Sequence, residues 1–257
     1  MNRKRVKKAA TACLLGMTAA LGLCACQGAS QDTAAQTDAN TETAAQEEKE
    51  MTDLDFTVSY DGIATAKLEA GVSVHDPSII KADGKYYLFG SHMSTAVSDD
   101  LQHWTAIGSG YKVKDPIYYE LMANEDAFAY AGSKKSVIPT DDRAWHVWAP
   151  DVIYNEANGL YYLYFCTSST WNASNLCYAT SESIEGPFVW KGAMIYSGFT
   201  AETLDATDVT DYVDREEAKN RYIKKSNEYK FEEYPNAIDP TVLYDKDGRM
   251  WMVYGSW

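Results

Sequence analysis

A short phrase containing an aspartate occurs three times in this chain, and each copy opens a pattern typical of a β-strand. Each copy then runs to a turn glycine and into a second strand rich in aromatic residues. A repeated unit of this kind favours the blades of a β-propeller, with three equivalent aspartates facing one axis. The copies are His75-Asp76-Pro77-Ser78-Ile79-Ile80, Ala149-Pro150-Asp151-Val152-Ile153-Tyr154 and Ile238-Asp239-Pro240-Thr241-Val242-Leu243, and the turn glycines are Gly84, Gly159 and Gly248.

The units differ in length. Residues 73–107 and 146–196 each predict four strands, whereas the unit that starts at 236 has two strands before residue 257. A propeller must close its last blade against its first. We therefore predict an all-β chain that holds about two and a half blades of a longer protein.

Two insertions interrupt the repeats. Residues 111–145 contain a helix-like stretch at 119–130, and residues 198–234 are acidic with a helix candidate near 214–225. Such insertions either wall a cleft or decorate the surface of a propeller, and the sequence supports both alternatives.

The N-terminal 55 residues stand apart from the repeats. Five basic residues lie within residues 1–8, and no charge follows through residue 26, which is typical of a secretory signal. The segment Leu23-Cys24-Ala25-Cys26 is similar to a bacterial lipobox, so residues 1–26 are predicted to be a lipoprotein signal peptide and Cys26 the lipidated residue. Simple secretion is the alternative. Residues 27–55 are predicted to be a disordered acidic tether, and residues 56–257 the truncated propeller domain. The lipid would hold the protein on the outer face of the bacterial cell membrane.

Charge and cysteine content narrow the class of protein. Without residues 1–26 the chain keeps 18 Lys and Arg against 37 Asp and Glu, a net charge of −19, which argues against nucleic acid as a partner. Cys166 and Cys177 remain, on successive predicted strands. A cross-strand disulfide and two buried thiols fit this placement equally well.

The recurring aspartates are the best candidates for chemistry, because clustered carboxyl groups raise one another's pKa and can divide the roles of base and acid. No phosphate-binding loop, serine nucleophile elbow or Cys-x-x-Cys pair is present, so nucleotide, serine-hydrolase and thiol-redox chemistry lack support. The four histidines have no metal-like spacing; they are His75, His92, His103 and His146.

Four motifs give the chain a family resemblance. They are His75-Asp76-Pro77-Ser78, Trp148-Ala149-Pro150-Asp151, Asn236-Ala237-Ile238-Asp239-Pro240 and Val253-Tyr254-Gly255-Ser256-Trp257. In this order they make residues 72–257, apart from the insertions, resemble family 43 glycoside hydrolases, and among these the endo-1,5-α-L-arabinanases. The resemblance implies a five-bladed β-propeller that hydrolyses α-1,5-linked arabinan with inversion.

The same resemblance assigns roles to two aspartates. It implies that Asp76 is the general base and that Asp239 is the pKa modulator. The general acid, a glutamate, has no counterpart in this chain and is expected beyond residue 257, so the fragment by itself should be inactive. The sequence around Glu185 is similar to the motif that carries the general acid in this family. Glu185 leads an outer strand, however, which argues against a role as the catalytic acid. For Asp151, a structural hydrogen-bonding role is favoured over a catalytic one.

The substrate is expected to be arabinan or an arabinoxylan-type polysaccharide. Tryptophan rings suit stacking on a furanose, with core packing as the alternative. The resembling arabinanases hold calcium near the axis, and its protein ligand would lie outside this chain. Rival functions are an exo-acting α-L-arabinofuranosidase or β-xylosidase, and a surface lipoprotein that binds carbohydrate without cleaving it. The candidate substrate-binding residues are Asn236, Ala237, Ile238, Ser256, Trp257, Trp148 and Trp171.

Overall fold

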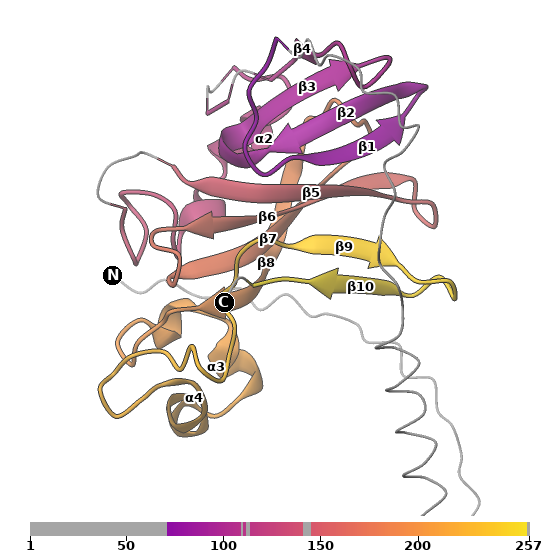
Figure 1. Cartoon of the computed structure of the whole chain (residues 1–257). Helices are drawn as coiled ribbons and strands as arrows, with labels where there is room; N and C mark the ends of the chain where they lie inside the picture. The colour runs from indigo at the N-terminus through magenta and orange to yellow at the C-terminus, as the bar shows by residue number, and fades with distance from the viewer. Residues whose placement is uncertain (1–70, 109, 112–113, 141–144, 256–257) are drawn as a thin grey trace, which may run out of the picture. The chain divides into compact units, whose positions relative to one another are not determined.

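A computed structural model describes residues 71–108, 110–111, 114–140 and 145–255. These residues form three antiparallel sheets, each with its strands in chain order, and a few short helices (Figure 1). Sheet 1 holds β1 (Ser78–Ala82), β2 (Lys85–Gly90), β3 (Ser94–Ser98) and β4 (Thr105–Ala106); sheet 2 holds β5 (Val147–Asn155), β6 (Leu160–Ser168), β7 (Ser174–Ser181) and β8 (Val189–Ser197); sheet 3 holds β9 (Thr241–Tyr244) and β10 (Met250–Val253). The predicted β class is confirmed. The signal peptide, the tether and the predicted roles of Cys26, Ser256 and Trp257 lie outside the described residues.

The three turn glycines lie where the sequence places them. In sheet 1, Ala82 pairs with Lys85, so the hairpin loop has only two residues. Both loop residues, Asp83 and Gly84, have positive φ, 50° and 79°, as a type I′ turn requires. Gly159 and Gly248 also have positive φ, in longer loops. These turns set the pairing register of each first hairpin.

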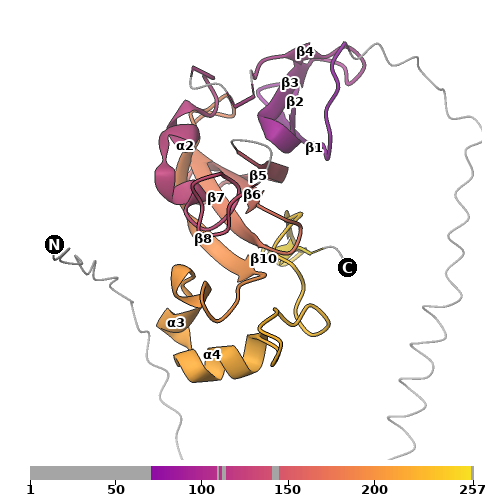
Figure 2. The same ribbon diagram turned by 90° about the vertical axis from the view of Figure 1, so that its left-hand side faces the viewer.

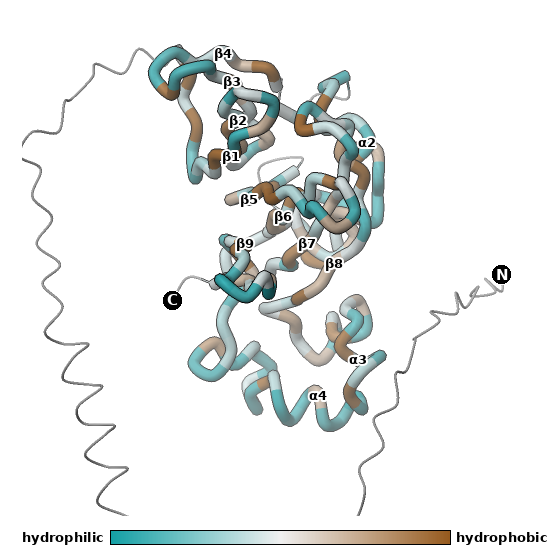
Figure 3. The backbone as a smooth tube through the Cα atoms, turned by 90° about the vertical axis from the view of Figure 1, so that its right-hand side faces the viewer, coloured by the Kyte–Doolittle hydropathy of each residue, from teal (hydrophilic) through white to brown (hydrophobic). Residues whose placement is uncertain are grey.

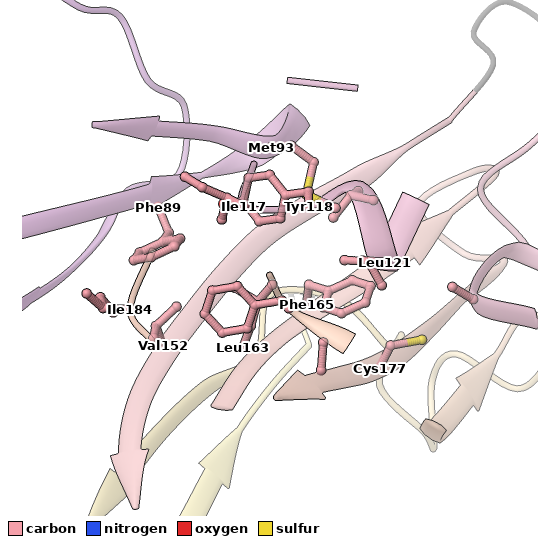
Figure 4. Close-up of a cluster of buried hydrophobic side chains, with 14 of the residues drawn as sticks. Phe89, Met93, Ile117, Tyr118, Leu121, Val152, Leu163, Phe165, Cys177 and Ile184 are labelled. Atoms are coloured by element: carbon pink, nitrogen blue, oxygen red, sulfur yellow. The ribbon is translucent and has the colours of Figure 1, made fainter. Parts of the chain in front are cut away.

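The main core lies between sheets 1 and 2. Phe89 of β2 and Phe165 of β6 are completely buried (Figure 4). The Phe89 ring meets Phe188 edge to face at 6.1 Å between centroids. Ile117 and Tyr118, from the first insertion, are buried in the same cluster. The segment around Ile117 and Tyr118 therefore belongs to the core. It is neither a cleft wall nor surface decoration, the two alternatives that the sequence supports. The helix predicted at 119–130 is two short helices, α2 (Tyr119–Ala123) and a 3-10 turn (Glu125–Phe128).

The second insertion forms a small helical unit with a core of its own. It contains a 3-10 turn (Leu204–Ala206), α3 (Val209–Tyr212) and α4 (Arg215–Tyr222). The Asp214 side chain accepts hydrogen bonds from two backbone N–H groups at the start of α4, which confirms the helix predicted near 214–225. Hydrophilic residues dominate α4 (Figure 3), and its one buried residue is Ala218. Aromatic rings pack beneath it, including Phe199 against Tyr229 at 5.0 Å.

The first strands of the three sheets are neighbours: β5 contacts both β1 and β9 (Figures 1 and 2). Because strands alternate in direction, β2 and β6 return to the end at which β1 and β5 begin. This end, which we call the entrance edge, comprises residues 75–78, 91–93, 147–151, 169–173, 197–198 and 235–241. In the described part of the chain no helix is long and apolar enough to cross a membrane.

The two cysteines are free and buried. Cys166 pairs with Leu176, whereas Cys177 pairs with Phe165, so the two thiols point to opposite faces of sheet 2. This geometry answers the question that the sequence left open, in favour of two thiols. Burial raises the pKa of both thiols, that of Cys177 to about 12.

Candidate functional site

Asp76 lies at the entrance edge, two residues before β1, with 41% of its side chain exposed. Its Oδ2 accepts a hydrogen bond of 2.6 Å from the Ser91 hydroxyl and lies 2.6 Å from His75 Nδ1. Both contacts use the same oxygen. Among the described residues nothing donates a hydrogen bond to Oδ1, so the described contacts anchor this carboxylate through Oδ2 alone.

Ser91 connects this aspartate to the neighbouring sheet. The residue is 2% exposed and starts the turn that follows β2. Its Oγ accepts a 2.8 Å hydrogen bond from Ala149 N at the bulge of β5, and its own N–H donates to His75 O at 2.9 Å. The sequence interpretation did not single out Ser91. The two-residue turn could have identified it, because the pairing of Ala82 with Lys85 places Ser91 opposite Asp76.

Asp151 is not equivalent to Asp76 and Asp239, and the alignment of three aspartates is wrong in this respect. The residue equivalent to both is Ala149: all three precede a proline, and their φ angles are 49°, 51° and 40°. An extra residue in β5 between Trp148 and Asp151 forms a β-bulge at this point. Asp151 lies two residues further along, level with Ser78.

The Asp151 carboxylate joins all three sheets. Its Oδ1 accepts from the Ser78 hydroxyl at 2.6 Å, and its Oδ2 accepts from Val242 N at 2.7 Å. Ser78 belongs to β1 and Val242 to β9. The structural role favoured for Asp151 is the one its contacts describe.

Asp239 occupies in sheet 3 the place that Asp76 has in sheet 1. It lies two residues before β9, and the carbonyl of the preceding Ile238 accepts from Gly255 N at 2.8 Å, as His75 O accepts from Ser91 N. The buried Cys166 thiol lies against the Asp239 backbone and donates to Trp148 O at 3.6 Å. The backbone that carries Asp239 is thus fixed to sheet 2.

Left-handed backbone concentrates at this edge. Of eight non-glycine residues with positive φ in the described ranges, five belong to the entrance edge. Such conformations cost about 1–3 kcal/mol each and persist where the surroundings hold them. The five are Asp76, His92, Met93, Ala149 and Asp239.

The candidate substrate-binding residues divide into two kinds. The side chains of Ala237 and Ile238 are buried with Cys166, and Asn236 is 1% exposed and donates from Nδ2 to Trp171 O at 3.1 Å. These three side chains pack against and anchor neighbouring segments, and their contact with substrate stays a prediction. Trp171 is 57% exposed at the entrance edge, in the loop between β6 and β7.

The Trp148 ring lies parallel to His146 at 5.6 Å and packs against the cluster around Cys166. Of the two candidate tryptophans in the described residues, only Trp171 has the exposure that a sugar-stacking platform needs.

Glu185 lies away from the entrance edge. It is in the loop between β7 and β8, at the opposite ends of the strands, and accepts a 3.0 Å hydrogen bond from the Tyr87 hydroxyl. Burial and this glutamate raise the pKa of Tyr87 to about 12. The geometry therefore agrees with the argument against Glu185 as the catalytic acid.

A cavity of about 530 Å³ lies between β8 and the second insertion. Burial raises the pKa of Asp208 in its wall. Pro235 and Tyr254 also line the cavity, and they adjoin Asn236 and Gly255, so this space borders the entrance edge. Aromatic rings contribute much of the lining, namely Tyr196, Phe199, Tyr212, Tyr222, Tyr229, Tyr234 and Tyr254.

The structure places Asp76 and Asp239 at equivalent positions, two residues before the first strands of sheets 1 and 3, as the resemblance to glycoside hydrolases implies. The chain belongs to glycosyl hydrolases family 43, whose family model matches residues 71–222. It is 35% identical to the extracellular endo-alpha-(1->5)-L-arabinanase of Thermotoga petrophila over 72% of this chain and 34% of that protein. It is 32% identical to the extracellular endo-alpha-(1->5)-L-arabinanase 2 of Bacillus subtilis over 79% of this chain and 37% of that one.

Solved structures show the same likeness. The endo-1,5-alpha-L-arabinanase of Thermotoga petrophila RKU-1 superposes with a TM-score of 0.55 at 34% identity, covering 75% of this chain and 37% of that one. A family 43 glycoside hydrolase from Bacillus licheniformis gives 0.54 at 32% identity, over 76% and 37%. The chain thus spans little more than a third of the length of these relatives.

Proposed function

We propose that this chain is the N-terminal part of a secreted endo-1,5-α-L-arabinanase that hydrolyses arabinan with inversion. Family membership supports a glycoside hydrolase, and the names of the two relatives above support arabinan as substrate. The observation that carries the proposal is the Asp76 carboxylate, which is 41% exposed at the entrance edge and is held there through Oδ2. The complete fold would be a five-bladed propeller to which sheets 1 and 2 contribute whole blades.

In this mechanism Asp76 acts as the general base. A water next to Oδ1 gives its proton to the carboxylate while its oxygen attacks the anomeric carbon, and the glycosidic oxygen leaves with a proton from the general acid. Inversion needs base and acid roughly 6.5–9.5 Å apart. The acid is a glutamate supplied by the part of the protein outside these 257 residues. Asp239, on its fixed backbone, tunes the pKa of that acid.

The remaining parts of the proposal concern binding and location. Trp171 offers an exposed ring for a furanose. A lipid at Cys26 and the tether of residues 27–55 would hold the enzyme at the cell surface. Calcium in the complete protein would be held by residues outside this chain, as the resemblance implies, and no step is assigned to it.

The test uses the full-length protein on linear arabinan, an aryl arabinofuranoside and an aryl xyloside. Release of arabino-oligosaccharides supports the endo-arabinanase. Monosaccharide from an aryl glycoside alone points to the exo-acting alternative, and no product from any substrate points to a binding protein. Asp76→Asn should abolish turnover while calorimetric binding of arabino-oligosaccharide persists, because the base is lost and the ring contacts remain.

The 257-residue chain by itself provides a second test. It should release no sugar from debranched arabinan, since the proposed acid is absent. Clear turnover by the purified chain would show that the acid has been assigned to the wrong part of the protein.

A further inference from the structure

Ser91 occupies a position from which its hydroxyl can donate in only one direction. A serine hydroxyl has a single hydrogen and two lone pairs. The N–H of Ala149 donates to Ser91 Oγ at 2.8 Å and so occupies one lone pair. The acceptor that receives the hydroxyl hydrogen is Asp76 Oδ2, at 2.6 Å. Because a backbone N–H cannot reverse its role, the Ser91 hydroxyl is locked as a donor to the carboxylate.

The backbone holds Ser91 in this place. His92 and Met93, the next two residues, both have left-handed φ, 63° and 62°. A Cβ at Gly90 would come within 2.7 Å of His75 O and would also meet Val74, so the residue before Ser91 must be glycine for the turn to lie this close to the Asp76 segment. The His92 ring contacts the Tyr111 hydroxyl at 3.0 Å, and that hydroxyl accepts from Val147 N at 3.0 Å. The turn is therefore tied to the start of β5.

We infer that Ser91 is a positioning residue for the Asp76 base, which fixes the rotamer of the carboxylate. The inference rests on the proposed function of Asp76. The orientation of the base is set from sheet 2 through Ala149 N, which donates to Ser91 Oγ, and through the Ser91 hydroxyl, which donates to Asp76 Oδ2. A hydrogen bond to a charged group is roughly twice as strong as one between neutral groups, so this contact holds the carboxylate in one orientation.

A matched pair of substitutions separates this role from a general loss of packing. Ser91→Ala removes the donor to Asp76, and Ser78→Ala removes a donor of the same length, 2.6 Å, to the structural Asp151. In the full-length protein, Ser91→Ala should lower kcat about 10-fold with little change in KM, because the base loses its orientation and the binding contacts remain. Ser78→Ala should leave kcat unchanged. Ser91→Thr, which keeps the hydroxyl, should retain most of the wild-type kcat.

A second readout does not depend on activity. In the protein labelled with 13C at aspartate carboxyl carbons, the Asp76 signal at pH 7, assigned with Asp76→Asn, should change its chemical shift in Ser91→Ala, because the carboxylate loses a hydrogen-bond donor. An unchanged signal, or an equal change in Ser78→Ala, overturns the inference. Failure of the wild-type protein to cleave any arabinan overturns the proposed function instead, and the signal then still decides whether Ser91 holds the Asp76 carboxyl group.

Discussion

Replacing Asp151 by alanine removes the acceptor of two hydrogen bonds that link sheet 2 to both of its neighbours. The Ser78 hydroxyl at 2.6 Å and the Val242 N–H at 2.7 Å each lose a charged partner. Hydrogen bonds to charged groups contribute about 1.5–3 kcal/mol each. Asp151 is only partly buried, so we take the lower end of the range and expect Asp151→Ala to reduce the free energy of unfolding by about 3 kcal/mol.

Asp151→Asn gives a graded comparison, because an amide of the same shape can accept one of the two bonds but presents its NH₂ group to the other donor. It should cost roughly half as much, about 1.5 kcal/mol. The control is Asp99→Asn, whose carboxylate is 82% exposed and 3.6 Å from Lys85, an ion pair of the kind worth about 0–1 kcal/mol. Urea unfolding of the chain at pH 7, followed by tryptophan fluorescence, measures all three. The role of Asp151 in linking the sheets is refuted if Asp151→Ala lowers the free energy of unfolding no more than Asp99→Asn does.

Three further predictions concern other parts of the molecule. Gly90→Ala should destabilise the chain by about 2–3 kcal/mol and disturb the Asp76 segment, whereas Gly192→Ala, whose new Cβ would meet nothing closer than 3.8 Å, should be tolerated in the same urea assay. The Cys177 thiol, with a pKa of about 12 in the folded chain against roughly 8.5 unfolded, keeps a proton that the unfolded chain loses. The stability that this thiol contributes is therefore complete below about pH 8.5 and falls above that pH by about 1.4 kcal/mol per pH unit. In Cys177→Ala the urea midpoint should decline less steeply between pH 8 and 10 than in wild type. An unchanged slope would contradict the raised pKa of Cys177. Glu185→Gln should leave kcat of the full-length protein unchanged, and a loss of more than about 100-fold would make Glu185 a candidate acid.

The local features of the fold could be predicted from the sequence. Gly84, Gly159 and Gly248 mark real turns because each needs a left-handed backbone that glycine supplies without strain. The four strands of sheet 1 and of sheet 2 follow from the same local signals. The first insertion was harder, because its core role depends on Ile117 and Tyr118 meeting Phe188, the residue before β8, a contact over a long sequence separation.

The misplacement of Asp151 has a specific cause. Asp76 and Asp151 both precede their turn glycine by eight residues, which suggested equivalence. The hairpin loop of sheet 1 has two residues, whereas the loop between Asn155 and Leu160 has four. The two additional loop residues hide a displacement of two residues at the strand start, so spacing alone could not distinguish Asp151 from Ala149.

Ala149 also shows what the entrance edge requires independently of chemistry. It has the left-handed backbone of Asp76 and Asp239, and the same following proline, without a carboxylate. This conformation is unfavourable for a residue before proline. Such a conformation persists only where the surrounding structure holds it, and here the junction between the sheets does so. At Ala149 the kink directs the N–H to Ser91 Oγ. The scaffold thus offers three equivalent kinked positions: two carry carboxylates, and the third uses its backbone to orient the hydroxyl that holds Asp76.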